Sequence, residues 1–230
     1  MHKKIGIIGG LSPESTVSYY LHITRSYVER YGDYGYPEIL IYSVNLENYH
    51  QWRSENRWDL IAEDLIFSAK SLQKAGADFG LIATNTMHKV FDIVQEAVSL
   101  PLINLIDVTA LSAKKNGLRR LGLLGTQYTM SDGFYHEQMA RHSLATIVPI
   151  AEDQKIIHKI IVEELVRGKL NERSKADYIT IINKLVGLGA EGIILGCTEI
   201  PLLIQQKDSS VPLLDTATIH AEAALEYALK

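Results

Sequence analysis

The single cysteine of the chain stands near the end of the stretch Leu188-Gly-Ala-Glu-Gly-Ile-Ile-Leu-Gly-Cys-Thr-Glu199. A closely similar stretch, Ala75-Gly-Ala-Asp-Phe-Gly-Leu-Ile-Ala-Thr-Asn-Thr86, lies 113 residues earlier. In both, a Gly-Ala pair leads into a short apolar run that ends in small polar residues. Thr84 occupies in the first stretch the place that Cys197 occupies in the second. Each stretch predicts a buried strand that delivers polar side chains at its carboxyl end.

Two further pairs of segments keep almost the same spacing. Lys3-Lys-Ile-Gly-Ile-Ile-Gly-Gly10 is similar to Arg119-Arg-Leu-Gly-Leu-Leu-Gly-Thr126, which lies 116 residues later. Pro101-Leu-Ile-Asn104 is similar to Pro212-Leu-Leu-Asp215, which lies 111 residues later. A repeat of about half the chain is far longer than a solenoid repeat, so it indicates two similar lobes.

The predicted elements alternate between strand and helix, which is typical of α/β proteins with parallel sheets. We expect one lobe from residues 1–107 plus 212–230 and the other from residues 108–211. Residues 45–57 are expected to form a polar, irregular loop. The predicted strands cover residues 5–8, 38–44, 81–83, 102–105, 121–124, 146–149, 193–195 and 211–214. The predicted helices cover residues 13–30, 58–75, 87–100, 108–116, 153–166, 175–188 and 218–229, with another ending near residue 142.

In parallel sheets, ligands bind at the carboxyl ends of the strands. Gly10, Thr84, Thr126 and Cys197 all fall at such ends. If the two lobes face each other about a pseudo-two-fold axis, Thr84 and Cys197 approach one ligand from opposite sides. The Gly-Gly turn before a helix start also offers backbone N–H groups to a carboxylate-sized anion.

The composition excludes several classes of function. The chain has 47% apolar and 22% charged residues, which is typical of a soluble globular protein. A net charge of −4 without a basic block argues against nucleic acid as a partner, and the apolar runs are too short to span a membrane. One cysteine excludes an internal disulfide and favours the cytoplasm. The eight histidines show no metal-ligand spacing, so we expect no metal.

Several interpretations of Cys197 remain open on the residues alone. It can be a small core residue. It can be a nucleophile, as in an amidase, with His88 or His220 as the partner that such a cysteine needs. It can also be one of two proton-transfer groups on opposite faces of one carbon, where one group removes the proton and the other returns it. Only the last interpretation explains the duplication. The donors suited to stabilise the resulting enediolate are Asn85, Thr86, Thr126 and Thr198.

Four segments carry a resemblance to a known family: Ile5-Gly-Ile-Ile-Gly-Gly-Leu-Ser-Pro-Glu-Ser-Thr16, Ala83-Thr-Asn-Thr-Met-His88, Leu123-Leu-Gly-Thr126 and Gly196-Cys-Thr-Glu199. Through them the whole chain resembles the cofactor-independent aspartate/glutamate racemases. The resemblance implies two pseudo-symmetric Rossmann-like lobes with parallel sheets and an active site in the cleft between them. It also implies a small-molecule amino-acid substrate, no pyridoxal phosphate, no metal and a homodimer.

The resemblance assigns roles to individual residues. The family's usual catalytic pair is two cysteines. Cys197 keeps the second, whereas Thr84 replaces the first, as in a subgroup that carries Thr-Asn-Thr-Met-His. Thr84 and Cys197 are therefore the expected catalytic pair, and Arg53 is expected to hold a substrate carboxylate. The expected substrate-binding residues are Leu11, Ser12, Arg53, Asn85, Thr86, Thr126, Thr198 and Glu199.

The threonine predicts unequal rates in the two directions. An alcohol is a far poorer base than a thiol, whose pKa is about 8.5. The family suggests that the L-substrate faces Cys197, so we expect a racemase of L- and D-aspartate or glutamate that favours the L-to-D direction kinetically. The alternatives are another enzyme of the superfamily, such as a maleate isomerase, a hydantoin racemase or an arylmalonate decarboxylase, and a non-catalytic amino-acid-binding protein.

Overall fold

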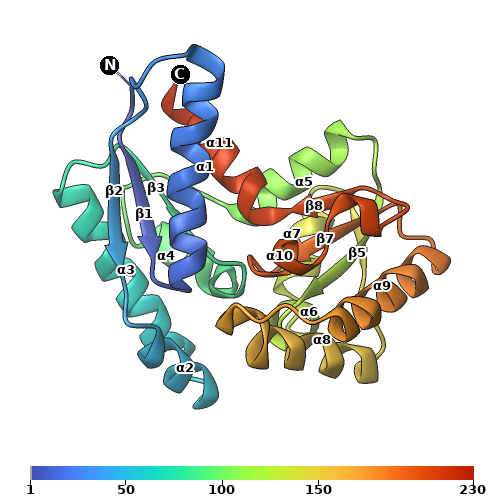
Figure 1. Cartoon of the computed structure of the whole chain (residues 1–230). Coiled ribbons are helices and arrows are strands. Elements are labelled where there is room, and N and C mark those ends of the chain that lie inside the picture. Colours follow the sequence, from blue (N-terminus) through green and yellow to red (C-terminus); the bar gives the residue numbers. More distant parts are fainter. Residues whose placement is uncertain (1) are drawn as a thin grey trace. The chain divides into compact units, whose positions relative to one another are not determined.

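The computed structural model describes residues 2–230 and divides the chain into two compact units (Figure 1). Unit 1 comprises Met1–Leu105 and Ala217–Lys230, and unit 2 comprises Ile106–Thr216. Each unit is built on one four-stranded parallel sheet with helices on its faces. The expected α/β class with parallel sheets is confirmed.

The sheet of unit 1 has the strand order β2-β1-β3-β4. Its strands are β1 (Ile5–Gly9), β2 (Ile39–Ser43), β3 (Phe79–Ile82) and β4 (Leu102–Ile103). Its helices are α1 (Pro13–Tyr31), α2 (Leu46–Ser54), α3 (Trp58–Lys74), the 3₁₀ helix η1 (Thr86–Val90), α4 (Phe91–Glu96) and α11 (Thr216–Ala228). The central strand β1 pairs in parallel with both neighbours, so Ile7 lies between Ile41 and Leu81.

Both faces of this sheet are buried because side chains alternate across a strand. Ile8 of β1 belongs to a cluster with Leu65 of α3 and other residues of α3 and α4. Ile5 and Ile7 belong to a second cluster with Tyr19 of α1 and residues of α11. The near-continuous apolar run of β1 is the pattern that a doubly covered parallel strand requires.

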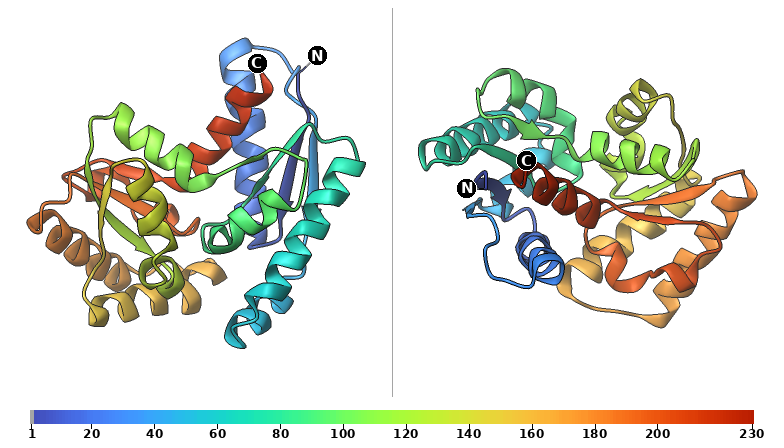
Figure 2. Two further views of the ribbon diagram at one scale, coloured as in Figure 1. Left: turned by 180° about the vertical axis from the view of Figure 1, so that it is seen from behind. Right: turned by 90° about the horizontal axis from the view of Figure 1, so that it is seen from above.

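The closing helix α11 returns to unit 1 and lies beside α1 (Figures 1 and 2). Arg30 at the end of α1 forms ion pairs with Glu222 and with Glu226, the latter at 2.6 Å. His22 of α1 also lies 3.3 Å from Glu222. These contacts join segments that are about 200 residues apart along the chain.

The sheet of unit 2 has the order β6-β5-β7-β8, which repeats the order of unit 1 strand for strand. The strands are β5 (Arg120–Gly125), β6 (Ala145–Ile147), β7 (Gly192–Gly196) and β8 (Leu213–Asp215). The same topology in both units accounts for the three repeated sequence pairs. The helices are α5 (Leu105–Lys115), α6 (Gln127–Ser131), α7 (Phe134–Arg141), α8 (Ala151–Glu163), η2 (Leu165–Arg167), α9 (Glu172–Gly187), α10 (Ile200–Leu203) and η3 (Gln206–Asp208).

The prediction of an irregular loop at residues 45–57 is wrong, because α2 occupies most of it. The Asn45 side chain caps this helix by accepting a hydrogen bond from the Glu47 N–H at 3.1 Å. Glu47 in the first turn and Arg53 in the last turn suit the helix dipole. The segment looks irregular in sequence because Tyr49 is the one residue of this helix that is buried, which leaves no apolar periodicity.

Most other boundaries differ from the predictions by a few residues, and two of these differences lie beside the candidate site. The helix expected at residues 87–100 divides into η1 and α4 and ends at Glu96. The strand expected at residues 102–105 stops at Ile103, and Leu105 already begins α5. Across residues 2–230, no helix combines the length and the apolar character needed to cross a membrane.

Candidate active site

The turn after β1 requires glycine. Gly10 has φ +81°, and a Cβ there would lie 2.5 Å from the Val44 carbonyl oxygen. The Gly10 N–H donates to Thr16 Oγ1 at 2.8 Å, so the start of α1 holds the turn in place. The backbone thus turns sharply at the carboxyl end of β1, which is the end at which ligands bind to parallel sheets.

Leu11 and Ser12, both expected to contact substrate, follow this turn and are buried. The Ser12 hydroxyl caps α1 by accepting from the Ser15 N–H at 3.3 Å. Ser15 in turn donates its Oγ–H to the Ala83 carbonyl at 2.9 Å. This bond joins the β1 turn to the residue before Thr84. The structure therefore brings Leu11, Ser12 and the Thr84 segment together at adjacent strand ends.

The segment Thr84–Asn85–Thr86 follows β3 after one residue, Ala83, and so lies at the carboxyl end of this strand. The Thr84 N–H donates to the Ile82 carbonyl at 2.8 Å, which turns the chain away from the strand. Asn85 is 2% and Thr86 is 5% exposed. Polar side chains this deeply buried at a strand end need defined hydrogen bonds, so they favour a binding function over a surface turn.

His88, four residues after Thr84, is hydrogen-bonded to the main chain of this segment. The Leu105 N–H donates to His88 Nε2 at 3.0 Å, so that nitrogen carries no proton. The proton therefore sits on Nδ1, which donates to the Thr84 carbonyl oxygen at 2.8 Å. The imidazole is neutral, is 5% exposed and has both nitrogens engaged.

His220 is fixed in the same way within unit 1. The Tyr19 O–H donates to Nδ1 at 2.9 Å, and Nε2 donates to the Ile103 carbonyl at 2.9 Å. Burial, with a smaller contribution from His88, lowers the pKa of His220 to about 3. Since both nitrogens of His88 and of His220 are engaged within unit 1, neither histidine is placed as a base for a nucleophilic cysteine. The amidase alternative loses its support.

Arg53 lies in the last turn of α2 rather than in a loop, which corrects the expected setting of this residue. Its guanidinium Nη2 donates to His50 Nδ1 at 2.7 Å. Burial and the charge of Arg53 lower the pKa of His50. Because α2 follows β2, Arg53 comes from the same edge of the sheet that carries Ser12 and Thr84.

In unit 2, the equivalent turn follows β5. Thr126 caps α6, and its Oγ1 accepts from the Thr129 N–H at 3.3 Å. The last residue of β5, Gly125, pairs in register with Gly196, the last residue of β7. Thr126 and Cys197 therefore follow neighbouring strands at one edge of the sheet. This is the same relation that Ser12 and Thr84 have in unit 1.

The Cys197 thiol is paired with a carboxylate. Its Sγ–H donates to Glu199 Oε2 at 2.9 Å, and the Thr198 hydroxyl donates to the same oxygen at 2.9 Å. Burial raises the pKa of the thiol well above its usual value, and the charge of Glu199 and this hydrogen bond raise it further. The Glu199 and Thr198 N–H groups act in the opposite direction without overcoming these effects. The resting group is therefore a thiol that faces a proton acceptor.

A helix N-terminus contributes little to the setting of Cys197. The helix after the cysteine, α10, has four residues, and Glu199 is its N-cap residue. So short a helix contributes little dipole. Glu199, expected to contact substrate, has the Cys197 thiol as a direct hydrogen-bond partner.

Tyr178 of α9 lies close to this pair and was not found from the sequence. Its ring is fully buried in the same cluster as Cys197. Its hydroxyl has no hydrogen-bond partner within residues 2–230. Burial raises the pKa of Tyr178 well above its usual value, and Cys197, Glu199 and Glu164 add to this increase. An aromatic residue on the apolar face of a helix looks like ordinary core, so the sequence held no signal for it.

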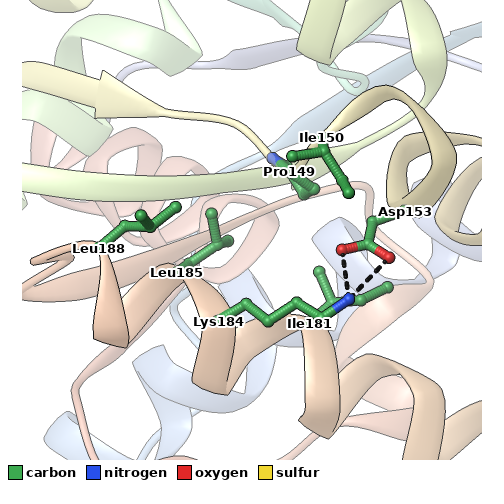
Figure 3. A pocket seen from close by; sticks show the side chains of 7 residues that line it. All are labelled: Pro149, Ile150, Asp153, Ile181, Lys184, Leu185 and Leu188. Atoms are coloured by element: carbon green, nitrogen blue, oxygen red, sulfur yellow. Dashed lines mark hydrogen bonds and ion pairs between the residues drawn. The ribbon is translucent and has the colours of Figure 1, made fainter.

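A cavity of about 330 Å³ lies elsewhere in unit 2, between α8 and α9 (Figure 3). Lys184 Nζ lies at one side and donates to both Asp153 oxygens, at 2.8 and 3.0 Å. None of the expected site residues lines it. The lining residues are Pro149, Ile150, Asp153, Ile181, Lys184, Leu185 and Leu188. Within residues 2–230, no three His, Cys, Asp or Glu side chains are grouped so as to hold a metal ion.

Comparison with known proteins assigns the family. The family model described as Asp/Glu/hydantoin racemase matches residues 8–224. The chain belongs to this family. Together with the racemases among its relatives, this confirms the expected class of enzyme, an isomerase acting on amino acids.

Two solved structures and one characterised relative cover nearly the whole chain. A putative Asp/Glu racemase from Yersinia pestis is 42% identical with a TM-score of 0.93, covering 99% of this chain and 100% of that one. An aspartate racemase homologue from Pyrococcus horikoshii OT3 is 41% identical with a TM-score of 0.88 and the same coverage. The broad specificity amino-acid racemase RacX of Bacillus subtilis (strain 168) is 22% identical over 231 residues, covering 96% of each chain. The resemblance inferred from the four motifs is confirmed.

Proposed function

We propose that this protein interconverts L- and D-aspartate or glutamate by removing and returning the α-proton without pyridoxal phosphate. The similar proteins named above include an aspartate racemase homologue and a broad specificity amino-acid racemase, which supports amino acids as substrates. The observation that carries the proposal is the hydrogen bond from the Cys197 thiol to the Glu199 carboxylate.

Through that bond, Cys197 can act as a base in one step and as an acid in the other, and a racemase needs both. For deprotonation, the thiol passes its proton to Glu199, and the resulting thiolate takes the α-proton of the L-substrate. For reprotonation, the thiol gives its proton to the substrate carbanion and is restored from Glu199. Because the two groups are buried together, the proton moves over one short bond rather than through bulk water.

Thr84 serves the opposite face of the α-carbon in this proposal. An alcohol is a weak base, so Thr84 mainly delivers a proton to the carbanion; it recovers that proton from solvent, and Glu199 returns its proton to solvent. The L-to-D direction therefore has the higher kcat, whereas kcat/KM stays equal in the two directions because the equilibrium constant of a racemisation is one. The groups proposed to bind the substrate and its enediolate are Leu11, Ser12, Arg53, Asn85, Thr86, Thr126, Thr198 and Glu199.

Chiral chromatography tests the proposal. The purified protein, with no added cofactor, is incubated with L-aspartate, L-glutamate and the D-enantiomers, beside Cys197→Ala and the control variant His22→Gln on α1. The proposal requires formation of the opposite enantiomer by the protein and by the control, and none by Cys197→Ala. Turnover that survives in Cys197→Ala would remove the cysteine from the mechanism. Binding of an amino acid without turnover would favour a binding protein.

The homodimer is part of the same proposal. The family resemblance supports it, and light scattering on the purified chain measures it directly. A mass near 25.7 kDa would contradict it.

A further inference from the structure

The structure points to a role for His88 that the reaction proposed above does not by itself require. His88 makes two hydrogen bonds, one to the carbonyl of Thr84 and one from the N–H of Leu105. Thr84 is the proposed proton donor on one face of the substrate. Leu105 is the last residue of unit 1 before the chain enters unit 2.

We infer that His88 is a positioning residue that fixes Thr84 through its main-chain carbonyl and so sets the rate of proton transfer on the Thr84 face alone. The inference rests on the proposed function, because it assumes that Thr84 transfers a proton.

The local backbone shows why such an anchor matters. Thr84 follows the end of β3, where the sheet hydrogen bonds stop. Its N–H is held by the Ile82 carbonyl at 2.8 Å, and its carbonyl by His88 at 2.8 Å. The peptide planes on both sides of the Thr84 Cα are thus fixed, and with them the direction of its Cα–Cβ bond. A displacement of about 1 Å at a proton-transfer group costs on the order of 100-fold in rate.

His88 is itself held from several sides. Its ring stacks on Phe91 at 5.3 Å between centroids, and His220 lies 6.0 Å away, edge to face. His220 in turn bonds to Ile103, two residues before Leu105. The imidazole is therefore a rigid connection between the Thr84 segment and the end of unit 1. A solvent-exposed helix-start histidine would not have these contacts.

Two substitutions of His88 each remove one of the two hydrogen bonds that its imidazole makes. The amide of Asn can occupy the place of Nδ1 and still donate to the Thr84 carbonyl, but it does not reach the Leu105 N–H. The amide of Gln can occupy the place of Nε2 and accept from Leu105, but it leaves the Thr84 carbonyl without its donor. Each variant loses one buried bond, so His88→Asn and His88→Gln are matched in their cost to folding.

The experiment follows exchange of the α-proton in D₂O for L- and D-aspartate separately. Loss of the proton from the L-enantiomer reports on Cys197, and loss from the D-enantiomer reports on Thr84. We expect His88→Gln to lower the rate of α-proton exchange of D-aspartate by on the order of 10- to 100-fold. The exchange rate of L-aspartate should change by less than about threefold. His88→Asn should behave like the unmodified protein in both, and Thr84→Ala should reproduce the pattern of His88→Gln.

Two outcomes would overturn the inference, because a purely structural role predicts both. One is that His88→Gln lowers the exchange rates of the two enantiomers equally. The other is that the Asn and Gln variants have the same exchange rates. Thermal unfolding of the two variants checks that they are equally folded. Failure of the proposed function has a different signature, because the unmodified protein would then show no Cys197-dependent exchange with either enantiomer.

Discussion

The Cys197 thiol donates a hydrogen bond to Glu199 Oε2 at 2.9 Å, two residues along the chain. The carboxylate therefore favours the protonated sulfur at rest and lies within hydrogen-bond distance to receive its proton. In the proposed mechanism this contact lets a cysteine with a raised pKa serve as a base. Glu199 then takes part in proton transfer, and its expected contact to the substrate stays a prediction.

Substitution of Glu199 by Gln removes the negative charge beside the Cys197 thiol but keeps the shape of the side chain. The charge of Glu199 raises the pKa of the thiol, so Glu199→Gln should lower that pKa. Turnover should nevertheless fall by about 100-fold, because an amide cannot receive the proton. Cys197 is the only thiol in the chain, so the pH dependence of alkylation by iodoacetamide reports on it alone. An unchanged or higher alkylation pKa would contradict the assignment.

The hydroxyl of Tyr178 should be dispensable for folding. It is buried and has no hydrogen-bond partner among the described residues, so Tyr178→Phe removes a desolvated group and should leave the free energy of unfolding unchanged or raise it by up to about 1 kcal/mol. Tyr49 provides the matched contrast, since its hydroxyl donates to Asp64 at 2.7 Å. Tyr49→Phe should lower the free energy of unfolding by about 1–2 kcal/mol. Urea unfolding measures both, and equal losses in the two variants would contradict this account.

Stability should fall as the pH drops below the usual pKa of histidine. The pKa of His220 is lowered from 6.5 to about 3 by burial, so the unfolded chain takes up a proton in this range while the folded chain does not. The stabilisation is complete above pH 6.5 and is lost toward pH 3, at up to about 1.4 kcal/mol per pH unit. His220→Gln keeps a donor toward Ile103 and should flatten the slope between pH 6.5 and 5. An identical slope in the variant would contradict the prediction.

Gly196 should tolerate no side chain. A Cβ there would lie 2.8 Å from the Leu124 carbonyl oxygen of β5. Gly196→Ala must therefore push β7 away from β5 beside Cys197, at a cost of about 1–3 kcal/mol in unfolding free energy and with loss of activity. Gly187, at the end of α9, is the control, because a Cβ there meets nothing within 4 Å. Gly187→Ala should be neutral or slightly stabilising, and equal destabilisation by both would contradict the packing argument.

The sequence predicted the two sheets because β1, β5 and β7 are short apolar runs that end in glycine, and the repeat indicated that the two units are similar. It failed at α2, where a capped but mostly polar helix shows no apolar periodicity. Hydrogen bonds between side chain and main chain decide such helices, and a reading based on burial alone overlooks them.

Strand ends were also the part of the candidate site that could be predicted. Thr84, Thr126 and Cys197 stand where an apolar run stops, so their positions follow from the pattern. The contacts of His88 and Tyr178 could not be predicted, because they form between segments only after folding. The sequence offered His88 as a partner for a nucleophilic cysteine, whereas the structure shows it bonded to the Thr84 carbonyl.

The most direct test of the central claim is proton NMR of L-aspartate in D₂O with the purified protein, beside Cys197→Ala. The account predicts that the α-proton signal disappears with the unmodified protein and persists with Cys197→Ala. Loss of the signal at the same rate in both would show that another group removes the proton, and the assignment of Cys197 and Glu199 as the proton-transfer pair would be wrong.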